Sequence, residues 1–257
     1  MSDLEVQTPP SAVPDTPGLS QWQRVTNTFT APSKTFLDIK RGNRSWWMPF
    51  IITAIASYIL FAAVATKIGM ATVVENQIHM DPKSEERMAQ LPPDQRETSN
   101  KIAVGVTQGV FIANPLLALA GFAVMSLGLW GTINFVFGGK ASYPGIFATF
   151  MYASLPSIVK VLLGVIVIYV GGMAPESFNI KNFAPTNFGA FLNPLETNKA
   201  LYSFASSIDI VTFWWLAVLA IGTATVAGVK RSSGYIAVFG WWAIIVLVGV
   251  GWAAAMG

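Results

Sequence analysis

Uncharged apolar stretches long enough to cross a lipid bilayer recur along the chain, with charged segments between them. A helix of about 20 apolar residues spans the roughly 30 Å hydrocarbon core at about 1.5 Å per residue. Four stretches reach this length without a charge inside them, at 46–66, 111–137, 210–229 and 235–256. These stretches predict four transmembrane helices.

The apolar stretch that follows residue 140 is harder to assign, because Lys160 divides it. Pro156 lacks an amide donor and disfavours helical geometry at the residue before it, so a helix should break there. We therefore expect an interfacial helix over 143–154 and one more transmembrane helix over 155–172. This helix brings the total to five and is the third span in chain order. Lys160 would then lie about 1.5 turns inside this span and extend its ammonium back to the interface.

The predicted fold class is therefore all-α: a polytopic membrane protein with five transmembrane helices over 46–257 and an N-terminal interfacial helix. Residues 1–20, rich in proline and small polar residues, predict a disordered tail. Residues 21–45 interleave apolar and basic positions, which is typical of a cytoplasmic amphipathic segment. The residues that mark this segment are Trp22, Phe29, Pro32, Phe36, Lys40 and Arg41.

The placement of Lys and Arg predicts a cytoplasmic N-terminus and a C-terminus on the outside. Five spans leave eight basic residues on the N-terminal side and seven on the other. The pairs Lys40-Arg41 and Lys230-Arg231 directly adjoin span ends, where the rule has most force. The excess is only one basic residue, but the basic pairs next to span ends all lie on the N-terminal side.

Composition narrows the functional classes. Hydrophobic residues make up 53% of the chain and charged residues only 11%, against about 25% charged in soluble domains. The net charge of +3 comes without a basic stripe, which argues against a nucleic-acid partner. The chain has no cysteine and a single histidine, His79, so thiol chemistry and multi-histidine metal sites are excluded. With no catalytic motif either, we expect no enzyme activity, metal or cofactor.

Four polar residues lie in or beside the spans and are candidate intramembrane sites. Asp209 precedes span four, where a carboxylate can cap the helix or contribute to an ion path. Lys160 is an interfacial anchor or a ligand for a substrate or a lipid phosphate. Because the predicted topology puts these two residues at opposite interfaces, we do not expect them to pair. Asn114 and Asn134 in span two line a polar cavity or mark a kink satisfied by a neighbouring helix.

Small residues also recur at helical spacing. Ala220, Ala224 and Gly228 share one face of span four, and Gly105 and Gly109 do the same near the start of span two. Such faces permit close helix approach. They predict either packing within the bundle or an interface with a second copy or another membrane protein.

Several spaced patches of sequence resemble one family. They are Phe29-Thr30-Ala31-Pro32 with Phe36 and Ile39, Trp46-Trp47 with Pro49, Tyr152 to Pro156, Leu201-Tyr202, Ser207 to Ile210, Trp214 to Gly222, Lys230, and Gly240-Trp241-Trp242. Together they are similar to bacterial members of the Yip (Ypt-interacting protein) family. The resemblance implies five spans and a cytoplasmic N-terminus, here in a bacterial inner membrane.

Eukaryotic relatives in this family act at endoplasmic reticulum and Golgi membranes with Rab-type GTPases and membrane-shaping partners. The Asp-Leu-Tyr-Gly-Pro-type motif of their cytoplasmic segment is missing here, which counts against a GTPase partner. Two functions stay open. The first is a non-enzymatic membrane-organising or trafficking-type adaptor, with the lipid bilayer, a second copy or other membrane proteins as partners. The second is a permease or channel component for a small solute or ion.

Overall fold

The structure, a computed structural model, describes residues 18–172 and 174–256, so nearly all of the predicted tail lies outside the described residues. The described part is helical and contains no β-strand. Five of its helical segments are long and apolar enough to cross a membrane. The prediction of an all-α, five-span membrane protein is thereby confirmed.

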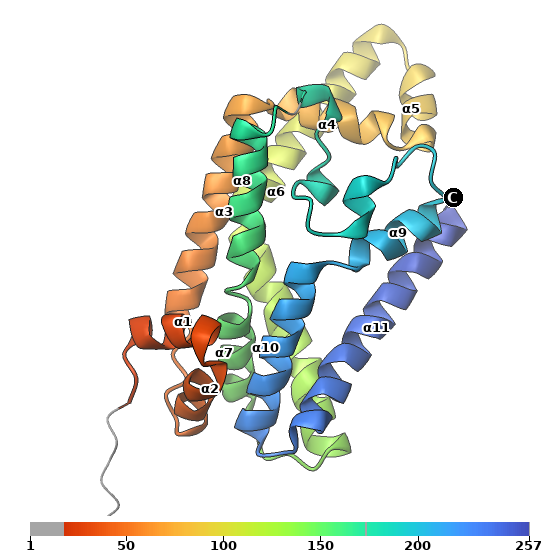
Figure 1. Ribbon diagram of the computed structural model, residues 1–257. Coiled ribbons are helices and arrows are strands. Elements are labelled where there is room, and N and C mark those ends of the chain that lie inside the picture. Colours follow the sequence, from red (N-terminus) through yellow and green to blue (C-terminus); the bar gives the residue numbers. More distant parts are fainter. Residues whose placement is uncertain (1–17, 173, 257) are drawn as a thin grey trace, which may run out of the picture.

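The five spans run alternately up and down as one bundle (Figure 1). They are α3 (Trp47–Lys67), α6 (Pro93–Gly131) with the π-helical turn η1 (Thr132–Val136), α7 (Tyr143–Ala153) with α8 (Ser157–Val170), α10 (Ile210–Ala227) and α11 (Arg231–Met256). Of these spans, α10 is the most buried. The odd number of crossings places the first helices and the C-terminus towards opposite ends of the bundle.

The third span differs from the prediction. The segment expected to be an interfacial helix is α7, and its residues Ala148, Phe150 and Tyr152 lie in the core. Leu155 in the turn before Pro156 is also fully buried. The proline interrupts the hydrogen-bond ladder, but the chain continues in the same direction through the bundle. The expectation of an interfacial helix was wrong, and the span covers Tyr143–Val170 instead of 155–172.

Span two is also longer than the apolar pattern predicted. Helix α6 has 39 residues, a length of about 58 Å, and so exceeds the bilayer thickness. Its polar N-terminal part packs with α4 (Met70–His79) beyond the end of α3, next to α5 (Pro82–Ala89). Near Pro115, which cannot donate to the helix ladder, the Tyr58 hydroxyl donates to the Ile112 carbonyl at 3.1 Å.

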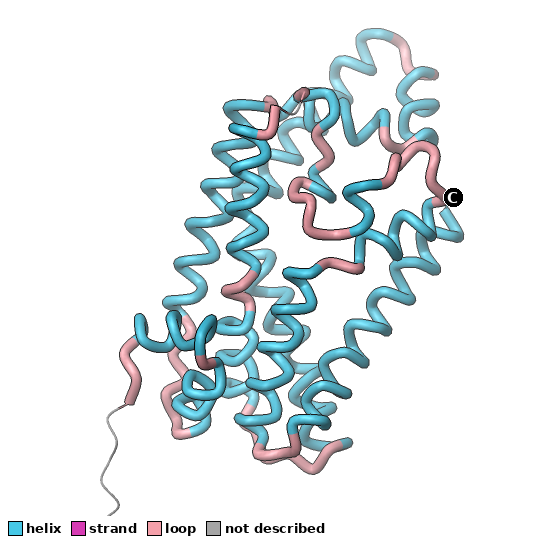
Figure 2. The backbone as a smooth tube through the Cα atoms, in the orientation of Figure 1, coloured by secondary structure: helices cyan, strands magenta, loops and turns pink. Residues whose placement is uncertain are grey.

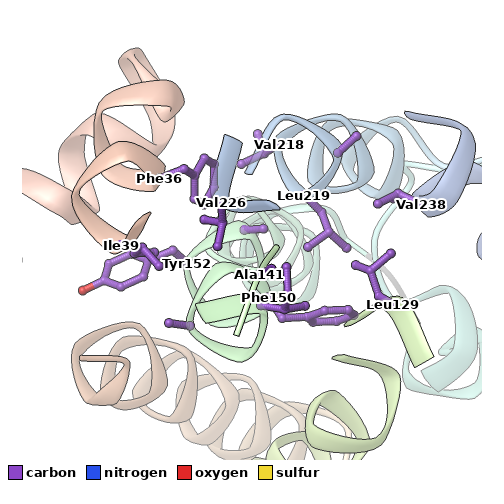
Figure 3. Close-up of a cluster of buried hydrophobic side chains, with 14 of the residues drawn as sticks. Phe36, Ile39, Leu129, Ala141, Phe150, Tyr152, Val218, Leu219, Val226 and Val238 are labelled. Atoms are coloured by element: carbon purple, nitrogen blue, oxygen red, sulfur yellow. The ribbon is translucent and has the colours of Figure 1, made fainter. Parts of the chain in front are cut away.

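The amphipathic segment forms two short helices, α1 (Gln21–Thr30) and α2 (Pro32–Lys40). A capping box between Ser20 and Gln23 starts α1, and Gly42, with φ of 118°, follows α2. We call residues 19–41 the N-terminal arm. The arm packs across α7 and α10, and Figure 3 shows Phe36 and Ile39 pointing into the core beside Tyr152 and Val226.

The connection between α8 and α10 folds back against the bundle. We call residues 174–209 the loop cap. It contains the 3-10 turns η2 (Pro175–Ser177), η3 (Ile180–Asn182) and η4 (Phe188–Phe191), and helix α9 (Lys199–Ser207), which packs on α11. Figure 2 shows this segment between α8 and α11. The buried Asn76 amide holds it by donating to the Pro175 carbonyl at 2.8 Å and the Phe178 carbonyl at 3.0 Å.

Candidate functional site

A buried ion pair joins the third and fourth spans. The Lys160 ammonium lies 2.8 Å from Oδ2 of Asp209. The Asp209 side chain is 2% exposed and that of Lys160 is 23% exposed. The expectation that these two residues do not pair was wrong.

The depth of this pair follows from the register of α8 beside α3. The Lys67 ammonium, at the end of α3, lies 5.0 Å from the centre of the Tyr169 ring. Lys160 precedes Tyr169 by nine residues, which is about 13 Å along the helix. Because the 21 residues of α3 extend over about 30 Å, Lys160 lies near the middle of the bundle. The turn before α8 thus lies well inside the bundle and not at its end, which explains the mistaken position of Lys160.

Asp209 is the last residue of the loop cap. It lies at the same level as Lys160 because the loop cap folds back into the bundle before α10 begins. Its Oδ1 accepts from the Thr212 amide at 2.9 Å, so it is the N-cap of α10, as the capping alternative predicted. Its Oδ2 also accepts from the Thr186 hydroxyl at 2.7 Å. The carboxylate therefore binds an ammonium, a hydroxyl and a helix end together. This arrangement fixes α8, the loop cap and α10 to one another.

The two asparagines lie apart from this pair and from each other. The Asn114 amide donates to the Ser57 hydroxyl at 2.9 Å between α6 and α3. Asn134, in η1, exchanges two hydrogen bonds of 2.9 Å with the backbone of Ala141 and so pins the connection to α7. Asn114 thus contacts a neighbouring helix, as the helix-kink alternative expected, whereas Asn134 holds the turn that follows its own span.

The small residues of α10 pack inside the bundle. Ala220 and Ala224 are buried, and a Cβ added at Gly234 of α11 would lie 2.3 Å from the Ala220 carbonyl oxygen. Gly228 ends α10 in the left-handed conformation, with φ of 71°. Gly105 and Gly109 differ, since nothing lies within 4 Å of a Cβ built at either. The structure thus puts the α10 face in intramolecular contact and leaves the α6 glycines open.

The sequence interpretation missed one buried polar cluster. Arg24 of α1 is fully buried, and its Nε lies 3.2 Å from Oδ2 of Asp38 in α2. Its guanidinium donates to the Asn43 carbonyl, to Oδ1 of Asn43 at 3.3 Å and to the Ser45 carbonyl at 3.1 Å. We call Arg24, Asp38 and Asn43 the arm lock.

The arm lock also fixes the arm to the bundle. The Arg24 guanidinium lies 4.6 Å from the centre of the Tyr152 ring of α7, and the Tyr152 hydroxyl donates to Gln21 at 2.6 Å. Burial lowers the pKa of Arg24, whereas the neighbouring Tyr152 and Asp38 raise it. The only signal for this cluster in the sequence was Asp38, the one acid between Asp15 and Glu75.

The predicted arm residues divide into a buried and an exposed set. Phe36 is buried, and a Cβ built at Gly222 of α10 would lie 2.8 Å from its ring. Phe29 makes an edge contact with Trp214 of α10, with ring centres 5.9 Å apart. Trp22 is 64% exposed, and Lys40 and Arg41 are exposed at the end of α2. Pro32 is the first residue of α2.

The contacts described above are structural, and none of them gathers the ligands of a metal site. Among the described residues, no three of His, Cys, Asp and Glu gather as a metal site would require.

A family model, the Yip1 domain, matches residues 26–253. Comparison with the curated proteins and with the solved structures found no significant match. The matched range includes most of the arm, the first four spans and all but the last three residues of α11.

Proposed function

Because the chain belongs to the Yip1-domain family of membrane proteins, we propose that it is a non-enzymatic adaptor that organises partners at the membrane through its N-terminal arm. The observation that carries this proposal is the construction of the arm. The Arg24 guanidinium over the Tyr152 ring fixes it to α7 and the Phe36 ring fixes it to α10, while Trp22 and Leu37 stay 64% and 44% exposed. A rigid segment with exposed aromatic and apolar side chains suits protein recognition.

The polar groups of the spans support the adaptor over a conduit. Asp209 is already bound by three groups, and the Asn114 and Asn134 amides bond locally on other helices. A solute path through the bundle would need polar groups that line one continuous cavity. These groups instead act as separate connections between neighbouring segments.

We further propose that the arm faces the cytoplasm at a bacterial inner membrane. The exposed cations Lys40, Arg41, Lys230 and Arg231 adjoin span ends on the arm side, as the positive-inside rule requires of a cytoplasmic face. Partners would then be cytoplasmic or membrane proteins, including a second copy of this chain.

Photo-cross-linking in native membranes tests the adaptor. A photoreactive amino acid replaces Trp22 or Leu37, and the adducts are identified by mass spectrometry. We expect a small, reproducible set of protein adducts. The matched control is Phe188, which is also 64% exposed but lies in the loop cap. Adducts to lipid alone from the arm, or the same proteins from Phe188, would contradict the proposal.

One observation favours a permease as the second candidate. Transporters often form their substrate and ion sites near the bilayer midplane from discontinuous helices, and here two charged side chains lie midway along the bundle beside the start of α10 and the break between α7 and α8. A transporter would conduct ions or protons in liposomes and lose that flux in the Asp209→Asn variant at normal protein levels. The adaptor gives no flux above that of empty liposomes.

A further inference from the structure

The two ends of the bundle differ sharply in charge. The arm end exposes seven basic residues, and its one described acid, Asp38, is buried in the arm lock. These residues are Lys34, Lys40, Arg41, Arg44, Lys140, Lys230 and Arg231. Within the described chain none of them forms an ion pair. At the opposite end, acidic and basic residues are interspersed.

Three separate segments that carry these cations lie next to one another. The Lys40 ammonium of α2 lies 3.3 Å from a Cβ built at Gly228, at the end of α10. The main-chain amide of Lys140 donates to the Ala227 carbonyl at 3.0 Å, so the segment before α7 adjoins the same end of α10. The Arg231 guanidinium reaches back to the Ser33 hydroxyl at 3.3 Å. Figure 2 shows the turn between η1 and α7 beside the turn between α10 and α11 at the lower end of the bundle.

Exposed apolar side chains lie in the segment just before Lys140. Phe135 and Val136, in the turn η1, are 80% and 71% exposed. Trp47, at the start of α3, is 49% exposed. Cations beside exposed aromatic and aliphatic groups are the combination expected where a protein meets the headgroup region of a bilayer.

We propose that Lys40, Lys140, Lys230 and Arg231 form a binding site for the phosphate headgroup of an anionic phospholipid. Basic pockets between transmembrane helices bind such headgroups because several cations share one phosphate while the acyl chains contact apolar side chains. Phe135 and Val136 would contact those chains. A soluble phosphate would use the cations alone and leave the apolar residues exposed, so the site favours a lipid.

Lipid retention by the purified full-length protein tests this site. The protein in detergent is mixed with equal amounts of phosphatidylglycerol and phosphatidylcholine, separated by gel filtration, and the retained lipids are quantified. The test variant combines Lys40→Gln, Lys140→Gln and Lys230→Gln. The control removes the same charge at the other end with Lys67→Gln, Lys101→Gln and Lys181→Gln. A third variant carries arginine at the three test positions.

We expect the wild-type protein and the control to retain phosphatidylglycerol preferentially and the arginine variant to match them. The test variant should bind it more weakly by on the order of 100-fold, since each cation near an anionic surface contributes about fivefold. An equal loss in both triple variants, or no preference for phosphatidylglycerol in the wild type, would overturn the proposal. Release of the lipid by excess inorganic phosphate at constant ionic strength would also overturn it, in favour of a soluble ligand.

Discussion

The Lys160 ammonium contacts the Asp209 carboxylate at 2.8 Å although 49 residues separate them in the chain. The contact forms because α7 raises the start of α8 to mid-depth and the loop cap lowers the start of α10 to the same level. Each partner removes the cost of leaving the other charge unpaired in a medium of low polarity. We expect this pair to be a structural connection whose loss destabilises the bundle.

The pair should show strong coupling between its two charges. Asp209→Asn keeps an acceptor for the Thr212 amide but leaves the Lys160 ammonium unpaired, so we expect a loss of about 3–5 kcal/mol of unfolding free energy. In a Lys160→Met background the Asp209 carboxylate is already left without its cation, so the same change removes an uncompensated charge and should be neutral or stabilising. Unfolding in lipid nanodiscs measures both. Equal costs in the two backgrounds would show that the residues do not interact energetically.

The arm lock should stabilise the docked arm without contributing to the stability of the transmembrane helices. Arg24→Met removes the partner of the buried Asp38 carboxylate, and breaking such a pair costs about 3–5 kcal/mol. Hydrogen exchange should therefore rise across residues 19–41 and stay unchanged in α10. Thr26→Ala, on the exposed face of the same helix, serves as the control. Unchanged protection of the arm in the Arg24 variant would contradict the lock.

Close approach of α10 and α11 depends on Gly234. An alanine there would put its Cβ 2.3 Å from the Ala220 carbonyl oxygen and 2.8 Å from the Ala224 Cβ. Gly234→Ala should therefore lower stability by about 1–3 kcal/mol through overpacking. Gly240→Ala in the same helix meets open space and should be neutral or slightly stabilising. If thermal unfolding ranks the two variants the other way, the helices do not pack at this face.

The orientation of the spans gives a topological expectation. A reporter that is active only outside the cytoplasm should work when fused after Gly257 and fail when fused at Lys140, since an odd number of spans separates the two ends. Fusions of equal expression level provide the comparison. Activity at Lys140 with none at Gly257 would reverse the assignment of the cytoplasmic side.

The uncharged stretches sufficed to predict four of the five spans, because burial of charge in a bilayer is costly enough to dominate local sequence. The third span was misplaced because Pro156 predicts a break but not the direction in which the chain continues. That direction depends on tertiary packing, here the burial of Phe150 against Trp215 of α10 and of Tyr152 against the arm. Because α7 belongs to the span, Lys160 lies midway along the bundle, beside Asp209. No pattern in the sequence predicts that position, so the contact between the two residues was not predicted.

The arm lock escaped prediction for a related reason. Arg24 looked like one of several cations on an amphipathic helix, and only the fold brings Asp38, Asn43 and Tyr152 around it. The family patches are informative in retrospect. Phe29 and Phe36 of one patch contact Trp214 and Gly222 of another, so the residues that carry the resemblance meet where the arm joins α10.

The central claim is that the arm, held on the bundle, is the element that partners recognise. The most direct test compares photo-cross-linking from position 22 in native membranes between the otherwise wild-type chain and the Arg24→Met variant at matched protein levels. We predict discrete protein adducts in the former and their loss when the lock is broken, with the five spans still inserted. The same adducts at the same yield from both proteins would contradict the claim, because recognition would then not depend on the docked arm.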